Sequence, residues 1–339
     1  MKVLFLGFSV TADQDGFVEC FASTTLESLD ISKIALGGIQ PHHLAFLVRD
    51  LLKNKSFDLV VLDISTAGFR SFLKKSTYLL ALINILKEVM LKGAKPIVFD
   101  IPRVDVDPDK DWVFATNEKI CKLFNLQYIR ATNYLDEPLN TYFRDGIHTN
   151  SFGASRLAHI LVNNINSTMC RKFSPSFDSI PDVVKKIQLD VYIPDDTSFD
   201  KVEFYRTGYT KSFLQLKEGE ILLVPVIDEL YCNGAFYLMG PETGRFRLNF
   251  GENEKVITAL DSHCYYQRLG VSFFEGVPIR NQIAVINDPT RPNVELIKGE
   301  LQTDNCSNYL GGFLVSNVQS IDEVANKLVD VSGFNFDLN

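Results

Sequence analysis

Long apolar runs and clusters of basic residues are both missing from this chain of 339 residues. No apolar stretch reaches the roughly 18 residues that a membrane-spanning helix needs, so we expect no membrane span. The Lys and Arg residues form no basic run, and the formal net charge is −8. This argues against nucleic acid as the main partner, because a phosphate backbone is bound by clustered cations. Neutral sugars remain compatible with this composition.

The sequence also leads us to expect neither a cysteine metal site nor a secretion signal. The six cysteines lie far apart and lack the spacing of metal ligands, so we expect no metal site. The apolar run at the N-terminus has only five residues, which is too short for the core of a signal peptide. Together these features predict a cytoplasmic protein with thiols scattered through its core.

The first half of the chain alternates short apolar runs with helical patterns. This alternation predicts a parallel sheet covered by helices on both faces, a three-layer α/β/α domain over residues 1–170. Ligands bind such sheets at the carboxyl ends of the strands. The expected strands are 3–7, 31–36, 57–64, 96–101 and 127–130, and the expected helices are 15–28, 41–53, 79–91, 112–124 and 155–165.

The pattern changes after a segment rich in Ser and Pro. We interpret residues 171–185 as a linker and residues 186–339 as a second domain, since each part is long enough to bury its own core. Short strand-like runs between turn signals predict an antiparallel β-sandwich there, with a jelly-roll-like arrangement. The runs are 187–193, 201–205, 221–227, 235–239, 246–250, 265–274, 282–286, 294–297 and 309–315, with a closing helix over 321–329.

The first strand ends in a motif that can carry chemistry. Val3–Gly7 is apolar, and Ser9 and Thr11 follow it closely. A glycine before a serine at a strand end allows a sharp turn that lifts the hydroxyl above the sheet edge. The helix expected over 15–28 would point its N-terminal amides towards that hydroxyl. Ser9 is therefore either a helix cap or a nucleophile.

A second motif, Asp145-Gly-Ile-His148, precedes the last helix of the first domain. An Asp three residues before a His lets the carboxylate accept a hydrogen bond from the imidazole Nδ1–H. The other ring nitrogen is then free to take a proton from a serine. A capping turn with an incidental histidine is the alternative. The chain has only five histidines, which favours the catalytic interpretation.

Taken together, Gly7-x-Ser9-x-Thr11 and Asp145-x-x-His148 resemble the SGNH (GDSL) family of serine esterases and acyltransferases over residues 1–170. The resemblance implies that Ser9 is the nucleophile, His148 the general base and then acid, and Asp145 the carboxylate that orients the imidazole. Such a base is needed because a free serine hydroxyl is a poor nucleophile at neutral pH.

The resemblance also implies an oxyanion hole with three donors. The backbone N–H of Ser9 matches the first, and Gly37 or Gly38 matches the second. The two glycines are equally well explained by a tight turn. The hole stabilises negative charge on the substrate oxygen, and losing one donor typically costs about 2.7–4 kcal/mol in the barrier.

The third donor is where the chain departs from the family. The family places an asparagine after the third strand, and that position aligns near Ala67. A hydroxyl of Ser65 or Thr66, or a backbone amide in this segment, could take its place. Phe8 also stands where the family has an acidic residue, although that residue is not a triad member.

Two further residues lie near the expected active edge. His42, next to His43 at the start of the second helix, either contacts substrate or lies in solvent. Arg103 follows the fourth strand. It either binds a carboxylate or phosphate of the substrate, or pairs with Asp105 or Asp107.

These features favour hydrolysis of an O-acyl ester, most simply acetyl, on a carbohydrate substrate, with no cofactor. One alternative is transfer of the acyl group to a sugar, with acetyl-coenzyme A as co-substrate. Another is a glycan-binding protein with a degenerate active site. A homo-oligomer is compatible with the sequence. Aromatic residues of the second domain form either a sugar-stacking platform or part of the core: Tyr231, Phe236, Tyr237, Tyr265 and Tyr266.

Overall fold

The computed structural model describes residues 1–24, 29–169, 178, 180–195, 198–225, 229–280, 282–288, 290–299 and 306–332. The chain divides into two compact units. The first comprises Met1–Lys186, Arg206–Tyr209 and Ala325–Asn339, and the second Ile187–Tyr205 and Thr210–Val324. The predicted linker lies mostly outside the described residues, and its last part forms helix α7, Asp182–Lys186.

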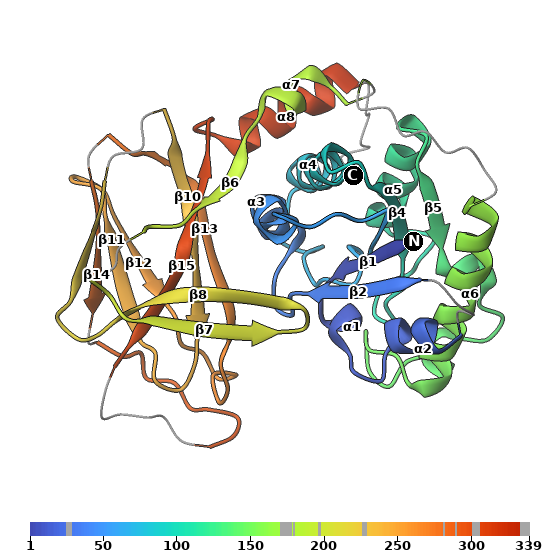
Figure 1. The fold of residues 1–339 in the computed structure, drawn as a ribbon, viewed down its shortest axis with the longest axis horizontal. Coiled ribbons are helices and arrows are strands. Elements are labelled where there is room, and N and C mark those ends of the chain that lie inside the picture. The colour runs from blue at the N-terminus through green and yellow to red at the C-terminus, as the bar shows by residue number, and fades with distance from the viewer. Residues whose placement is uncertain are drawn as a thin grey trace. The chain divides into compact units, whose positions relative to one another are not determined.

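A parallel five-stranded sheet organises the first unit. Its strands lie in the order β2-β1-β3-β4-β5, and helices cover both faces (Figure 1). The strands are β1 Lys2–Gly7, β2 Asp30–Ala35, β3 Leu59–Leu62, β4 Lys95–Asp100 and β5 Gln127–Arg130. The helices are α1 Ser9–Ala12, α2 Phe17–Thr24, α3 Pro41–Leu51, α4 Lys75–Leu91, α5 Trp112–Leu123 and α6 Ser151–Met169. The three-layer prediction is confirmed.

The apolar strands explain why this sheet is central. β3 is buried at all four positions, and in β1 only Lys2 is exposed. Phe5 of β1 packs edge-on against Phe17 and Phe21 of α2, which fastens that helix to the sheet. The parallel register places Gly7 beside Ala35, and Leu6 beside Leu62. The segments that follow β1, β2 and β3 therefore start from one edge of the sheet.

The structure corrects the predicted helix after β1. A single turn, α1, starts at Ser9 itself, and α2 starts only at Phe17. Residues 25–28, the predicted end of this helix, lie outside the described residues. Two other helices begin four residues earlier than expected, α4 at Lys75 and α6 at Ser151.

The second unit contains two antiparallel sheets. One has the order β13-β10-β15-β8-β7, with β6 also paired to β15, and the other has the order β12-β11-β14-β9. Buried side chains from both sheets share one core, so this is the expected sandwich. The strands are β6 Leu189–Tyr192, β7 Lys201–Arg206, β8 Tyr209–Leu216, β9 Ile221–Val224, β10 Tyr231–Met239, β11 Arg245–Asn249, β12 Glu254–Thr258, β13 Arg268–Pro278, β14 Ile283–Asp288 and β15 Asn308–Ser316. Helix α8 spans Ile321–Ser332.

Three strand predictions in this unit differ from the structure. β8 and β12 were not expected, and residues 294–297 were expected as a strand but form none. Ile297 is exposed, and its amide bonds the carbonyl of Ser262, which lies in a turn. The short apolar run at 294–297 therefore pairs with no neighbouring strand. Jelly-roll connectivity stays a prediction.

The cysteines of the described residues are free thiols. Four are buried and Cys20 is partly exposed, while Cys170 lies outside the described residues. Burial raises the pKa of the Cys121 thiol well above its usual range. Within the described ranges, no helix has the length and apolar character that crossing a bilayer requires.

Candidate active site

Ser9 lies at the carboxyl edge of the sheet, where β1 turns into α1. The turn depends on Gly7, because a Cβ placed there would lie 2.2 Å from Thr11 Oγ1 and 3.0 Å from Asp63 Cβ. Only glycine lets β1, α1 and the end of β3 approach so closely. The predicted role of the glycine is thus explained by crowding at this strand end.

His148 lies in a short hairpin-like turn that leads into α6. Phe143 pairs with Thr149 as an antiparallel bridge, and Arg144 N donates to His148 O at 2.9 Å. Asn150 N donates to the carbonyl of Tyr142 at 3.0 Å, and Tyr142 is almost completely buried. The turn that carries the histidine therefore rests on a buried aromatic residue.

The structure brings Ser9, His148 and Asp145 together. His148 Nε2 lies 3.1 Å from Ser9 Oγ, and His148 Nδ1 lies 2.9 Å from Asp145 Oδ2. Both distances are those of hydrogen bonds. The arrangement matches a serine with an adjacent base whose ring is oriented by a carboxylate.

Asp145 is held as a carboxylate by its local backbone. Its Oδ1 accepts from His148 N at 2.7 Å and from Ile147 N at 2.8 Å. Partial burial acts to raise the pKa of Asp145, but these amides and the imidazole outweigh it and lower the pKa to about 2. The carboxylate is therefore ionised throughout the neutral range and accepts the Nδ1–H.

A salt bridge ties the histidine turn to the serine segment. Arg144 Nη2 lies 2.9 Å from Asp13 Oδ2, and Asp13 is the C-cap residue that directly follows α1. The carbonyl of Asp13 also accepts from Lys33 Nζ of β2. These contacts join the turn that carries His148 to the segment that carries Ser9 and to β2.

Gly37 and Gly38 follow β2 at the same edge. A Cβ on Gly37 would lie 3.9 Å from Ser9 Cβ, so its backbone passes close to the serine. Gly38 has a φ of 83°, which favours glycine and forms the turn into α3. The two predicted roles of this glycine pair, a donor near the serine and a tight turn, therefore fit different residues. Gly37 lies beside Ser9, and Gly38 is required by the turn.

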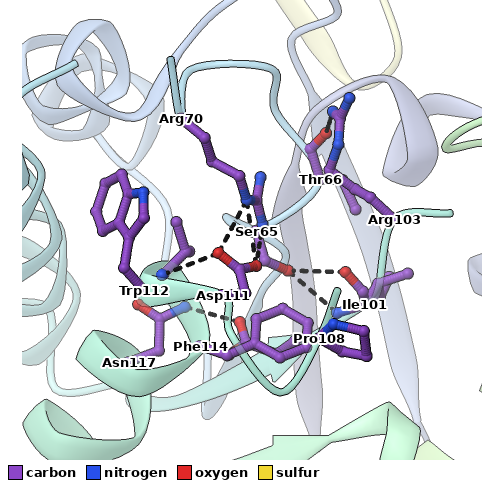
Figure 2. A network of polar contacts seen from close by, with 12 residues as sticks. Ser65, Thr66, Arg70, Ile101, Arg103, Pro108, Asp111, Trp112, Phe114 and Asn117 are labelled. Carbon is purple, nitrogen blue, oxygen red and sulfur yellow. Dashed lines mark hydrogen bonds and ion pairs between the residues drawn. The ribbon is translucent and has the colours of Figure 1, made fainter. Parts of the chain in front are cut away.

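The predicted hydroxyl donors after β3 are already engaged. Ser65 is buried; its Oγ accepts from Ile101 N at 3.1 Å and lies 3.2 Å from Ile101 O (Figure 2). Thr66 Oγ1 donates to Asp63 Oδ1 at 2.9 Å. Both hydroxyls therefore already have other hydrogen-bond partners in the fold. Their place in the oxyanion hole stays a prediction, as does that of a backbone amide around Ala67.

Asp63 is a buried carboxylate directly after β3. It accepts from Thr11 Oγ1 at 2.8 Å and from Thr66 Oγ1 at 2.9 Å, so it joins the serine segment to the segment after β3. Complete burial raises the pKa of Asp63 to about 6, although the two hydroxyl hydrogen bonds act to lower it. Sequence reasoning missed this residue. A polar side chain at the carboxyl end of a strand of four apolar residues was the available signal.

The segment after β3 is also fixed farther along. Arg70 forms a paired contact with Asp111, with Nε 3.0 Å from Oδ1 and Nη2 2.6 Å from Oδ2 (Figure 2). Asp111 Oδ1 in turn caps α5 by accepting from Val113 N. A bidentate, mostly buried pair of this kind holds its geometry well. Residues 65–70 are therefore anchored to both β4 and α5.

The two predicted substrate-binding residues are placed differently. Arg103 pairs with Asp105 through Nε at 2.8 Å and Nη2 at 2.6 Å, and its Nη1 donates to the carbonyl of Thr66. The pairing alternative therefore describes Arg103. His42 is buried against His43, so the solvated alternative is wrong. Burial lowers the pKa of His42 to about 4, which leaves it neutral at pH 7.

The aromatic residues of the second domain divide in the same way. Phe236 and Tyr237 are buried in its core, whereas Tyr265 and Tyr266 are each 38% exposed. The core interpretation therefore describes Phe236 and Tyr237, while Tyr231 is partly exposed. In the described part of the chain, no group of three or more His, Cys, Asp or Glu side chains is arranged to hold a metal ion.

Comparison with known proteins finds similarity in structure rather than in sequence. A scan against protein-family models gave no match, and a search of curated proteins also found none. The structure resembles that of a two-domain esterase active on acetylated mannans, with a TM-score of 0.61 at 13% identity, covering 93% of this chain and 90% of that one. The same esterase co-crystallised with mannopentaose gives a TM-score of 0.58 at 14% identity, with the same coverage.

An acetyl xylan esterase also matches, with a TM-score of 0.42 at 16% identity, covering 48% of this chain and 98% of that one. The mannan esterase match extends across both units of the chain. The predicted fold, an α/β domain followed by antiparallel sheets, is thus confirmed.

Replacing Thr11 by Val should slow acyl-ester turnover without unfolding the chain. The change keeps the size of the side chain but removes one donor to the buried Asp63 carboxylate, a hydrogen bond worth about 1.5–3 kcal/mol. We expect kcat to fall roughly tenfold, measured with p-nitrophenyl acetate. Thr116→Val is the matched control, because this buried hydroxyl bonds only the α5 backbone at Trp112 O. Equal rates for the two variants would contradict the role given to Thr11.

The buried Asp63 should leave a pH signature on stability. Its pKa of about 6 lies above the ordinary 3.8, so the folded state holds the proton longer and stability falls as pH rises from about 4 to 6. Asp63→Asn removes this loss, so the variant should gain stability relative to wild type across that window. Fluorescence of Trp112, the only tryptophan, monitors unfolding of the first unit.

Asp145→Asn should change the pH dependence of stability in the direction opposite to Asp63→Asn. The pKa of Asp145 is depressed to about 2, so its stabilisation is present above pH 4 and disappears towards pH 2. This variant should lose stability relative to wild type as pH rises from about 2 to 4. A pH-independent difference for Asp63→Asn would show that the carboxyl is not perturbed.

Proposed function

We propose that the first unit hydrolyses acyl esters with Ser9 as nucleophile, His148 as general base and acid, and Asp145 as the orienting carboxylate. The observation that carries this proposal is the 3.1 Å contact between His148 Nε2 and Ser9 Oγ. It supports a proton transfer from the hydroxyl to the ring as the hydroxyl attacks.

The reaction follows from these contacts in two halves. Ser9 Oγ attacks the ester carbonyl carbon, and His148 Nε2 takes the hydroxyl proton. The tetrahedral intermediate collapses when the ring donates that proton to the leaving alcohol oxygen, which leaves an acyl-serine. Water then attacks the acyl carbon and gives a proton to the same nitrogen. The second tetrahedral intermediate collapses as the ring returns that proton to Ser9 Oγ, which breaks the acyl–serine bond and releases the carboxylic acid.

The charge that develops on the carbonyl oxygen needs backbone donors. Ser9 N at the start of α1 and Gly37 N beside it are the donors that we propose. With both side-chain hydroxyls after β3 engaged, we assign the third position to a backbone amide near Ala67. Backbone amides are effective here because they are already oriented and cost no reorganisation during the reaction.

For the substrate, we propose an O-acetylated carbohydrate. A similar structure that covers both units is that of an esterase active on acetylated mannans, so the similarity includes the β-sandwich as well as the α/β domain. This argument rests on fold, so the site residues remain the stronger basis for the chemistry. A serine esterase of this type needs no cofactor.

Ser9→Ala should abolish hydrolysis of p-nitrophenyl acetate, with a loss of at least a thousandfold in kcat, because no other group replaces the nucleophile. Ser23→Ala is a suitable control, since that exposed hydroxyl only bonds the carbonyl of Cys20 within α2. Unchanged hydrolysis by Ser9→Ala would refute the assignment.

Acetylated mannooligosaccharides extend the same experiment to the substrate. Wild type should release acetate, seen as a mass loss of the sugar, and Ser9→Ala should not. Transfer to a sugar would instead add mass when deacetylated oligosaccharide is incubated with acetyl-coenzyme A. Such a gain, lost in Ser9→Ala, would show that the same three residues serve an acyltransferase.

A further inference from the structure

Four neighbouring strands of the six-stranded sheet have one of their two ends at the same sheet edge in the second unit. In the order β13-β10-β15-β8, the C-terminal ends of β10 and β8 lie beside the N-terminal ends of β13 and β15. The register pairs Tyr309 of β15 with Gln215 of β8, and Glu242 follows β10. Tyr266 and Gln267 lead into β13, and Ser307 leads into β15.

These residues line an open hollow with a volume of about 510 Å³. Small-molecule sites commonly enclose roughly 300–1,000 Å³, so the hollow has the size of a binding site. All of its lining residues belong to the second unit, and none is part of the triad. The mechanism proposed above does not use them.

The chemistry of the lining suits uncharged hydroxyl groups. It offers two carboxamides, two phenols, a serine hydroxyl and one carboxylate, Glu242, and contains no Lys or Arg. A phosphate or carboxylate ligand would meet the like charge of Glu242 with no cation among the lining residues, and an acyl chain would meet mostly polar groups. Sugar hydroxyls both donate and accept hydrogen bonds, which matches amides, phenols and a carboxylate.

Two tyrosines provide the apolar surface that a sugar ring needs. Tyr266 is 38% exposed and contacts the Tyr265 ring, with centroids 4.9 Å apart. Tyr309 is mostly buried at the hollow. Burial first, and Glu242 next, raises the pKa of Tyr309 to about 12, so its hydroxyl keeps its proton. Aromatic rings of this kind combine an apolar face with a polar tip.

The polar groups are held in place before any ligand arrives. The carbonyl of Glu242 accepts from Ser307 N at 3.1 Å and from Arg291 Nη2 at 2.7 Å. Its side chain accepts from Gln267 Nε2 at 2.7 Å, and Gln215 Nε2 donates to Ser307 Oγ at 3.1 Å. A site that is already ordered pays less conformational entropy on binding.

We propose that this hollow binds a neutral oligosaccharide, with Tyr266 as the stacking surface and Glu242 and the two glutamines as hydrogen-bonding partners. The site would hold a glycan chain on the second unit whether or not that chain carries an acyl group. The proposal is therefore separate from the ester chemistry of Ser9, and each can fail without the other.

Isothermal titration calorimetry on the full chain tests this with mannopentaose, xylopentaose and cellopentaose as probes. We expect one of them to bind wild type and Ser9→Ala equally. Tyr266→Ala should weaken that binding at least tenfold, and Glu242→Gln, which keeps the side-chain size, should weaken it severalfold. Tyr266→Phe should retain most of the affinity because the ring face remains.

Tyr205→Ala is the matched control, since Tyr205 is 72% exposed in β7 of the same sheet and does not line the hollow. It should bind like wild type. The variants of Tyr266, Glu242 and Tyr205 should hydrolyse p-nitrophenyl acetate at the wild-type rate, which shows that they are folded and that the active site is intact.

Four results would overturn the proposal. Absence of binding for all three probes at millimolar concentration would exclude a neutral glycan site. Binding that persists unchanged in Tyr266→Ala and Glu242→Gln would place the ligand elsewhere, and competitive inhibition of ester hydrolysis by the probe would place it at Ser9. Preferential binding of polygalacturonate oligomers or of peptides would show a different ligand class.

Discussion

The hydrogen bond between His148 Nε2 and Ser9 Oγ is the contact on which the functional interpretation depends. The two residues are 139 positions apart in the chain. The parallel sheet brings them together because β1 delivers the serine to its carboxyl edge, and the turn before α6 brings the histidine back to the same edge. The serine depends on this proximity, because a serine hydroxyl without an adjacent base is a weak nucleophile at neutral pH.

Buried polar contacts hold this edge in one geometry. The Asp63 carboxylate receives Thr11 from one side and Thr66 from the other, and it lies where a side chain on Gly7 would collide. Burying a carboxylate is costly, as its raised pKa shows. Such a cost is tolerated most readily where the hydrogen bonds fix segments that must stay in register, as the serine turn and the segment after β3 must.

The sequence predicted those features of the site that depend on residues close together within a motif. It did not predict side-chain contacts between distant segments that no motif marks. The proximity of Ser9, Asp145 and His148 could be predicted from a strand-end turn and a pre-helix turn, whereas their roles were implied by the resemblance to SGNH esterases. The partner of Ser65 could not be predicted, because its hydroxyl bonds the backbone of Ile101, which only the folded sheet brings near. Most strands of the sandwich could be predicted from their apolar residues. β8 and β12 could not, because both strands contain exposed as well as buried positions and so form no continuous apolar run.

Labelling with a fluorophosphonate is the most direct measurement of the central claim, since this reagent reacts with a serine only when an adjacent base activates it. Peptide mapping by mass spectrometry should place the label on Ser9 in wild type, and His148→Ala should remove it while Trp112 fluorescence shows a folded first unit. A folded wild-type protein that takes no label at Ser9, or takes it equally in His148→Ala, would contradict the account.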